Sequence, residues 1–249
     1  MNVHDEARRG FGQGAEAYER GRPGYPARAI RWLERRLELG PGRTVVDVGA
    51  GTGKLTRELM TSGADVLAVE PVAAMRAVFE QSVPEARVSD GTAEALPLDD
   101  GSVDAILVAQ AFHWFDGPAA LAEFHRVLRP DGRMGLIWNR RLRGQPLWRA
   151  ISEITEPYRR DTPTHSRGEW RASMTSTALF TRVDELEVPH EQDLGPDQLV
   201  DRIGSTSFIA SLDDDERGRV LARIRAVAAG AGGSVRLGYA TEAYVYQRA

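Results

Sequence analysis

No cysteine occurs in this chain of 249 residues, and that absence restricts its chemistry. Disulfide bonds, thiolate nucleophiles and cysteine-ligated zinc are all excluded. The five histidines stand at positions 4, 113, 125, 165 and 190 and show no paired spacing of metal ligands. We therefore expect neither a reactive thiol nor a bound metal ion.

Long apolar runs are also missing. None approaches the roughly 18 residues of a membrane-spanning helix, and the amino-terminal residues lack the charged-then-apolar pattern of a secretion signal. We expect a soluble, cytoplasmic protein with no membrane partner.

The net charge is −4 and the basic residues are dispersed, so no nucleic-acid partner is expected. Lys54 is the only lysine among 32 basic residues. GC-rich codon usage explains this excess of arginine, because a functional explanation would require clustering that the sequence does not show.

The most informative feature present is an apolar run that ends in three alternate glycines. The run Val45–Gly53 reads as a buried strand turning sharply into a helix, and Glu70 follows 23 residues after Asp47. Glycines at such a turn let a ligand lie against bare peptide groups. An acid one strand–helix unit later is placed to bind the two hydroxyls of a ribose. The pattern therefore predicts a nucleoside cofactor.

Two other nucleotide-binding patterns fit the glycines less well. A phosphate-binding P-loop requires glycine where Val48 stands and a hydroxyl where Leu55 stands. A dinucleotide-binding turn requires a third glycine at the position of Lys54. A nicotinamide-dependent reductase usually also needs a Tyr-x-x-x-Lys pair, which cannot exist here because Lys54 is the only lysine. The spacing therefore disfavours both a P-loop and a nicotinamide dinucleotide.

This glycine run resembles the first motif of the class I S-adenosylmethionine-dependent methyltransferases, D-x-G-x-G-x-G, in which a second-strand acid binds the ribose. The resemblance implies S-adenosyl-L-methionine as cofactor and S-adenosyl-L-homocysteine as product. It assigns cofactor contacts to Asp47, Gly49, Ala50, Gly51, Gly53, Glu70 and Pro71.

The rest of the chain predicts an α/β fold of the Rossmann-like type. Repeated strand–helix units require a parallel sheet with helices on both faces. We expect seven strands, mostly parallel, with the last antiparallel as the resemblance implies. Their predicted ranges are 44–48, 65–69, 86–89, 103–109, 133–138, 183–188 and 240–246, and a turn is predicted at 129–132.

The domain organisation follows from the segments that lie outside this sheet. We expect an N-terminal lid and first helix in 1–40 and a cofactor-binding core in 41–139. The remainder, 140–249, would supply the last strands of the core and two helical insertions, 140–180 and 190–238. Helices are expected at 196–203 and 213–229. Long insertions between paired strands are rarely neutral, so we interpret both as covers over the substrate, with helical surface decoration as the alternative.

The amino-terminal segments 11–18 and 19–26 resemble the lid of small-molecule methyltransferases of the trans-aconitate methyltransferase type. The resemblance assigns Tyr18 and Arg22 to the methionine carboxylate of the cofactor and Tyr25 to the substrate. An arginine on a glycine- and proline-rich arm is suited to pairing with a carboxylate and closing out water. The alternative is a loosely packed amino-terminal arm.

The segments after the third and fourth strands complete the predicted site. Residues 90–98 resemble the adenine-contacting motif, which assigns Thr92 and the backbone of Ala93 to the cofactor, although Asp is common where Thr92 stands. Residues 109–116 leave the central strand beside the crevice where open α/β sheets bind ligands. There Gln110 is assigned to the cofactor, Trp114 to the substrate and His113 to catalysis. Further substrate contacts are expected from Asn139, Trp170 and Ser207.

The predicted function is methyl transfer to a small molecule, with O-methylation of a carboxylate preferred because of the subgroup resemblance. In that case His113 orients or neutralises the acceptor, and for a hydroxyl or amine acceptor it is the nearby group suited to removing the proton. The alternatives are a hydroxyl- or amine-directed natural-product methyltransferase and a non-catalytic nucleoside-binding module. We expect a monomer or homodimer.

Overall fold

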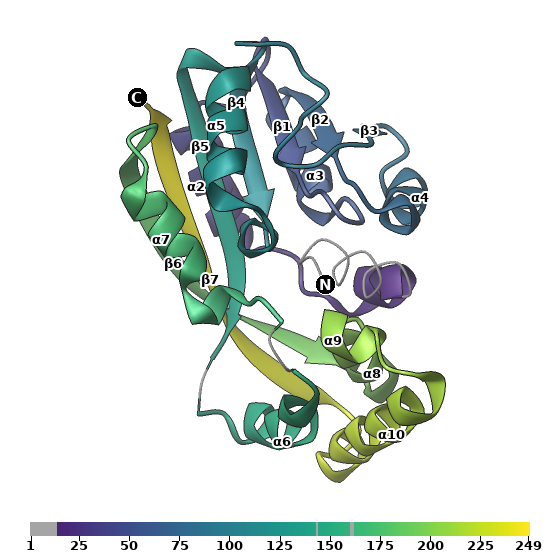
Figure 1. Ribbon diagram of the computed structural model, residues 1–249. Coiled ribbons are helices and arrows are strands. Elements are labelled where there is room, and N and C mark those ends of the chain that lie inside the picture. Colours follow the sequence, from purple (N-terminus) through teal and green to yellow (C-terminus); the bar gives the residue numbers. More distant parts are fainter. Residues whose placement is uncertain (1–13, 143, 160–161) are drawn as a thin grey trace. The chain divides into compact units, whose positions relative to one another are not determined.

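The computed structural model describes residues 14–142, 144–159 and 162–249, which fold around a seven-stranded sheet (Figure 1). The strand order is β3-β2-β1-β4-β5-β7-β6, and β7 runs antiparallel to an otherwise mostly parallel sheet. The predicted Rossmann-like fold is confirmed. The strands are β1 (Thr44–Val48), β2 (Asp65–Val69), β3 (Arg87–Ser89), β4 (Val103–Ala109), β5 (Leu128–Arg141), β6 (Phe180–Leu194) and β7 (Val235–Arg248).

Helices connect and cover these strands. Residues 14–21 are helical, and the other α-helices are α2 (Ala27–Arg36), α3 (Lys54–Leu59), α4 (Ala73–Ser82), α5 (Gly117–Val127), α6 (Pro146–Thr155), α7 (Glu169–Ser176), α8 (Pro196–Gly204), α9 (Ser207–Ala210) and α10 (Asp214–Gly230). Short 3₁₀ turns occur at η1 (Met60–Ser62), η2 (Phe112–Trp114), η3 (Glu156–Tyr158) and η4 (His165–Arg167). The start of α5 shows how sequence fixes a boundary. The Asp116 carboxylate accepts a hydrogen bond from the Ala119 N–H, and proline occupies the first turn.

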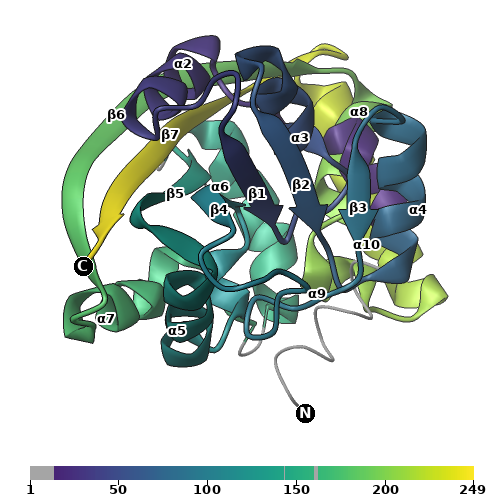
Figure 2. The same ribbon diagram turned by 90° about the horizontal axis from the view of Figure 1, so that it is seen from above.

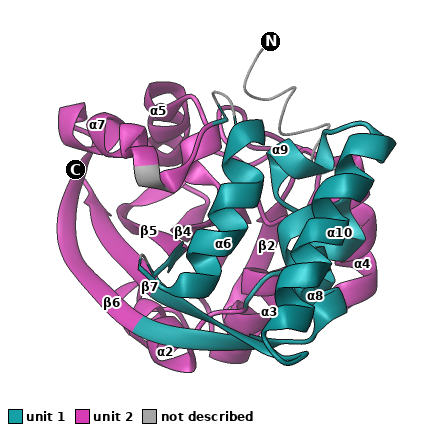
Figure 3. Cartoon of the chain, turned by 90° about the horizontal axis from the view of Figure 1, so that it is seen from below, with its two compact units in different colours: residues 1–23, 140–162, 189–240 teal, residues 24–139, 163–188, 241–249 magenta. Residues whose placement is uncertain are grey.

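The chain divides into two compact units (Figure 3). Unit 1 comprises residues 1–23, 140–162 and 189–240, and unit 2 comprises residues 24–139, 163–188 and 241–249. Unit 1 has its own apolar cluster, which gathers residues of α6, α8, α9 and α10 and the first part of β7. Strands β5, β6 and β7 each carry residues of both units.

Unit 2 has an apolar cluster on each face of its sheet. Figure 2 shows helices α2 and α5 on opposite faces of this sheet. Alternate residues of one strand enter opposite clusters, because successive side chains point to opposite faces. Val46 packs with α5 and α7, whereas Val45 packs with α2 and α3. Both clusters are buried, so the central strands β1 and β4 are mostly apolar, with one buried acid in each, Asp47 and Asp104. The register pairs Asp47 of β1 with Ala68 of β2 and Leu107 of β4, which brings the carboxyl ends of these strands to one edge.

The later strands extend beyond their predicted ranges. Strand β5 begins at Leu128, so the turn predicted at 129–132 is wrong: Leu128 pairs with Val103 and Arg133 with Ala105, and the residues between form an irregularity in the strand. The ends of β5, β6 and β7 also take in parts of both predicted insertions. Residues 190–193 are polar and carry no apolar alternation, so no sequence pattern predicts a strand there.

Candidate functional site

The glycine turn after β1 opens one side of its backbone to a ligand. Gly49, Gly51 and Gly53 have positive φ angles of 70°, 59° and 85°, a region that favours glycine. A Cβ on Gly49 would lie 2.9 Å from the Cβ of Ala111, and one on Gly53 would lie 2.6 Å from Val83. At Gly51, by contrast, no heavy atom of the described chain lies within 4 Å of that position. Packing therefore requires two of the glycines, and the third leaves free space.

Glu70 lies at the end of β2 and binds this turn directly. Its Oε2 accepts a hydrogen bond from the Gly51 N–H at 2.9 Å, and its Oε1 accepts one from the Val72 N–H at 2.8 Å. Burial raises the pKa of Glu70, and these two backbone donors oppose the shift. A carboxylate offers about four lone-pair positions. Two donors leave acceptor capacity for a pair of hydroxyl groups.

Asp47 is a fully buried acid at the end of β1. Its Oδ2 accepts a hydrogen bond from Thr56 Oγ1 at 2.7 Å, which ties β1 to α3. Its Oδ1 has no hydrogen-bond partner among the described residues. Burial raises the pKa of Asp47 to about 7, opposed by the Thr56 hydrogen bond and reinforced by the negative charge of Glu70.

Arg76 of α4 holds the ends of β2 and β3 together, a role that its place in an ordinary amphipathic helix did not reveal. Its Nη1 donates to the backbone oxygen of Glu70 at 2.7 Å and pairs with Asp90 at 3.0 Å.

Beyond β3, Thr92 forms an isolated bridge with Ala95, and Ala93 is buried. These contacts fix the segment assigned to the adenine. Pro71 follows Glu70 and Ala50 stands within the glycine turn, where the Ala50 N–H donates to Val69.

The segment after β4 begins with a strained residue. Gln110 has a φ of 59°, and such a left-handed conformation costs a non-glycine residue of order 1 kcal/mol or more. Its N–H donates to Ile137 of β5 at 2.9 Å. The chain then enters η2, in which Trp114 is buried and His113 is half-buried. Glu94 accepts the Asp116 N–H at 2.9 Å, which joins this segment to the one after β3.

His113 is oriented by Trp138 of β5. The indole Nε1–H donates to His113 Nδ1 at 3.4 Å. An indole nitrogen only donates, so Nδ1 must accept, and this network assigns the hydrogen of the neutral ring to Nε2. His113 therefore presents Nε2 as a hydrogen-bond donor. The sequence did not predict this contact, because Trp138 stands 25 positions after His113.

Three residues predicted to contact substrate have packing roles in unit 2. Trp170 is buried and packs on Trp138, with ring centroids 4.5 Å apart, and on His165 at 5.5 Å. Asn139 donates to the Gly24 oxygen at 2.9 Å and accepts from Thr241 at 2.7 Å, which fixes the segment ahead of α2. Tyr25 is half-buried against the cluster that contains α2.

The other predicted residues, Tyr18, Arg22 and Ser207, belong to unit 1. Arg22 donates to the Ser205 backbone oxygen at 2.9 Å, and its guanidinium lies 4.8 Å from the centre of the Tyr18 ring. Arg20 pairs with Asp201 of α8 at 2.7 Å. Ser207 is buried at the start of α9. Residues 14–23 of the predicted lid are thus packed on the second insertion, while 11–13 lie outside the described residues.

Two further features are relevant to the class of site. Within the described ranges, no helix is both long and apolar enough to cross a membrane. The same residues contain no group of three or more His, Cys, Asp or Glu side chains arranged to hold a metal ion.

Comparisons with known proteins agree with this geometry. Residues 46–136 match a family model described as a methyltransferase domain. An uncharacterized methyltransferase of Mycobacterium bovis is 42% identical over 215 residues, which cover 86% of this chain and 84% of the relative.

Two solved structures share the fold. A putative type II methyltransferase from Anaeromyxobacter dehalogenans has a TM-score of 0.66 and 24% identity, covering 90% of this chain and 97% of its own. Geranyl diphosphate methyltransferase in complex with SAM has a TM-score of 0.53 and 20% identity, covering 90% of this chain and 85% of its own. The chain belongs to the methyltransferase family, and its fold and first motif are those of the class I S-adenosylmethionine-dependent enzymes.

Proposed function

We propose that this methyltransferase transfers the methyl group of S-adenosylmethionine to a carboxylate oxygen of a small molecule. The observation that carries the choice of acceptor is the hydrogen bond from Trp138 to His113 Nδ1. It makes His113 a donor at Nε2, which suits an acceptor that is already an anion. A carboxylate is deprotonated at neutral pH and needs no general base.

The ends of β1 and β2 fit the cofactor on two observations. The open space beside Gly51 allows close approach to the backbone, and Glu70 keeps acceptor capacity for the ribose hydroxyls. We assign Glu70 to the ribose, Thr92 and Ala93 to the adenine, and Tyr18 and Arg22 to the methionine carboxylate. The remaining proposed cofactor contacts are Asp47, Gly49, Ala50, Gly53, Pro71 and Gln110. Geranyl diphosphate methyltransferase, which shares the fold, is known in complex with SAM.

In this mechanism the protein acts mainly by positioning. When bound, S-adenosylmethionine supplies a methyl group on a sulfonium, which is an excellent leaving group. The chain must hold the acceptor oxygen in line with that methyl group and exclude water. His113 Nε2–H donates to one oxygen of the acceptor carboxylate, which leaves the other to attack. Trp138 positions His113, and Trp114 and the strained Gln110 shape the same segment. Tyr25, Asn139, Trp170 and Ser207 stay proposed substrate contacts.

The test is an acceptor screen in two stages. Isothermal titration with S-adenosylmethionine first establishes binding. Matched panels of carboxylates, phenols, alcohols and amines are then analysed by mass spectrometry for the gain of one methyl group. Esters from the carboxylate panel are the expected product, whereas methyl ethers or methylamines alone would favour the hydroxyl- or amine-directed alternative.

A further inference from the structure

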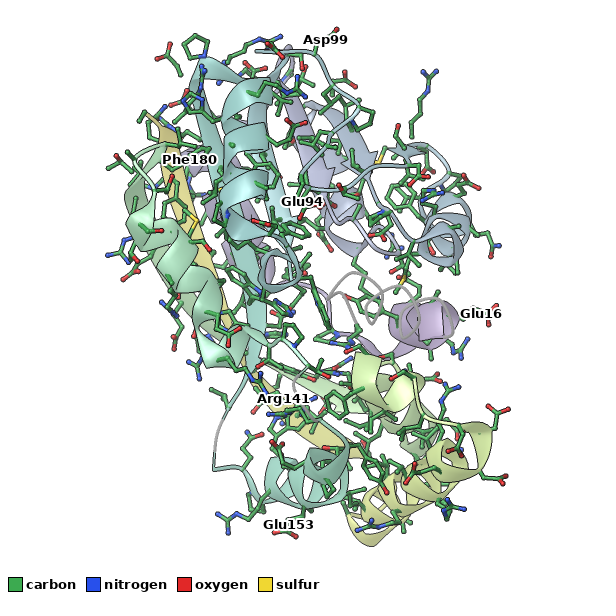
Figure 4. The ribbon with its side chains drawn as sticks, in the orientation of Figure 1. Glu16, Glu94, Asp99, Arg141, Glu153 and Phe180 are labelled. Carbon is green, nitrogen blue, oxygen red and sulfur yellow. The ribbon has the colours of Figure 1, made fainter. Side chains whose placement is uncertain are left out.

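Unit 1 contains a group of arginines that gather around Trp148. Arg141, labelled in Figure 4, is the last residue of β5. Its guanidinium lies 4.4 Å from the centre of the Trp148 ring. Arg202 of α8 lies 5.8 Å from the same ring. Arg22 and Arg159 are close enough that their charges act on Arg141. We call Arg22, Arg141, Arg159 and Arg202 the arginine cluster.

The charges at the centre of the cluster are poorly compensated. Arg202 is only 4% exposed, and its Nε donates to the neutral Tyr239 hydroxyl at 3.0 Å. Its Nη1 is buried and makes no hydrogen bond to any described residue. Arg141 makes neither a hydrogen bond nor an ion pair with the part of the chain that the structure describes; its one close partner is the Trp148 ring. Burial and the positive charge of Arg202, with smaller effects of Arg22 and Arg159, lower the pKa of Arg141 to about 9.

Among the described residues, Glu156 is the one acid that pairs with Arg141, Arg159 or Arg202 through its side chain. Glu156 lies 3.2 Å from Arg159 and is itself more than half exposed. The Nε of Arg159 is nevertheless buried with no hydrogen-bond partner among the described residues. Proteins rarely bury an arginine without pairing it, because the loss of hydration is costly. The two buried guanidinium nitrogens, Arg159 Nε and Arg202 Nη1, together with the charge of Arg141 therefore favour binding of an anion from outside the chain.

We propose that the arginine cluster binds an oxyanion of a small molecule, a carboxylate or a phosphate. Guanidinium groups bind planar carboxylates and phosphates through paired N–H donors. Arg202 is 4% exposed and lies 5.8 Å from the ring centres of both Trp148 and Tyr239, so the cluster fits a compact group of a small molecule. The arginine-rich composition thus includes a functional cluster that the linear sequence does not show.

The test measures oxyanion binding in the absence of S-adenosylmethionine and of any methyl transfer. Melting temperatures of the wild type, Arg141→Met and Arg236→Met are compared in inorganic phosphate, pyrophosphate or succinate, each against chloride at equal ionic strength. Arg236 is the matched control, because it belongs to unit 1, is 63% exposed and pairs with Asp193. We expect saturable stabilisation of the wild type and of Arg236→Met by at least one oxyanion, and none in Arg141→Met.

The melting temperature without added anion separates binding from a structural role. Arg141 is partly buried and unpaired, so Arg141→Met should be as stable as the wild type or more stable. Loss of an arginine with a structural role would instead lower the melting temperature. Arg141→Lys keeps the charge and loses the paired donors, so it should show a weakened response. No saturable response in the wild type, or an intact response in a destabilised Arg141→Met, would overturn the proposal.

Discussion

Glu70 has two tasks in unit 2, because the carboxylate that is proposed to bind the ribose also holds the glycine turn. Glu70→Ala should therefore weaken S-adenosylmethionine binding by tenfold or more, since charge-assisted hydrogen bonds contribute roughly 1.5–3 kcal/mol each. Isothermal titration measures the loss. Glu70→Gln is the matched control, because it keeps one acceptor for the turn and loses the charge. An Ala variant that folds and binds as tightly as the wild type would contradict the ribose assignment.

The Trp138–His113 pair determines which chemical role the histidine can play. Trp138→Phe removes the N–H that fixes the ring, so carboxylate methylation should fall roughly tenfold without loss of cofactor affinity. His113→Ala should lower the rate further, and His113→Gln, which still offers an N–H donor, should restore part of it. The pH dependence of kcat separates the roles. A donor gives a rate that does not rise as the imidazole loses its proton, whereas a general base gives a rising limb.

Asp47 makes stability depend on pH in a defined direction. The pKa of Asp47 is near its ordinary value of 3.8 in the unfolded chain and is raised to about 7 by burial in the folded protein. The folded state thus favours the protonated acid. This contribution is fully present below about pH 4 and is lost as the pH rises through 7. Asp47→Asn should remove it, so the stability difference between variant and wild type should grow in favour of the variant from pH 5 to 8. Chemical denaturation across this range measures the difference, and parallel curves would contradict the burial argument.

At the level of elements, two glycines of the turn after β1 have different roles. Packing requires Gly53, whereas Gly51 leaves space for the proposed cofactor. Gly51→Ala places a methyl group in open space, so we expect a stability cost of about 1–2 kcal/mol from the left-handed φ, together with a larger loss of cofactor affinity. Gly53→Ala meets Val83 and Phe79 in addition, so it should destabilise the fold more. Denaturation and titration of both variants measure the two effects. Equal effects of the two substitutions on affinity and stability would contradict this division.

The sequence was most reliable for elements whose pattern is local. The bounds of β1, β2 and β4 are as predicted, because each is a short apolar run between turn residues. Strands β5, β6 and β7 were predicted too short, since their added residues depend on pairing with distant strands and β6 is polar on one face. Val235, Leu237 and Tyr239 do alternate into the core of unit 1, a signal of period two that was available and missed.

The candidate functional site shows the same limit of prediction from local sequence patterns. The residues of one strand–turn–helix unit, such as Asp47, Gly51 and Glu70, could be found from their spacing. Contacts between segments far apart in the chain could not. The arginine cluster joins residues 22, 141, 159 and 202, and the Trp138 contact with His113 spans 25 positions. No periodicity links such positions, so only the folded structure reveals them.

At the scale of the whole molecule, residues 14–23 of the predicted lid belong to the same unit as the second insertion. Arg20 pairs with Asp201, Arg22 binds Ser205, and Gly21 packs so closely on the α8 backbone at Arg202 that a side chain there would collide with it. A mobile lid that closes alone would have to break these contacts. We therefore expect residues 14–23 and α8 to respond to ligands together.

Hydrogen exchange followed by mass spectrometry tests this coupling. On addition of S-adenosylmethionine or S-adenosylhomocysteine, exchange in Tyr18–Tyr25 should slow, because binding shifts local opening toward the closed state. Peptides of α8 should slow in parallel, since both segments share the same packing. Arg20→Ala removes the ion pair with Asp201 and should speed exchange in both segments without ligand, whereas Arg182→Ala, which removes an exposed ion pair with Glu185 of β6, should leave both segments unchanged. Slowing of one segment without the other would show that the amino-terminal residues move independently, and identical exchange with and without ligand would contradict a lid role.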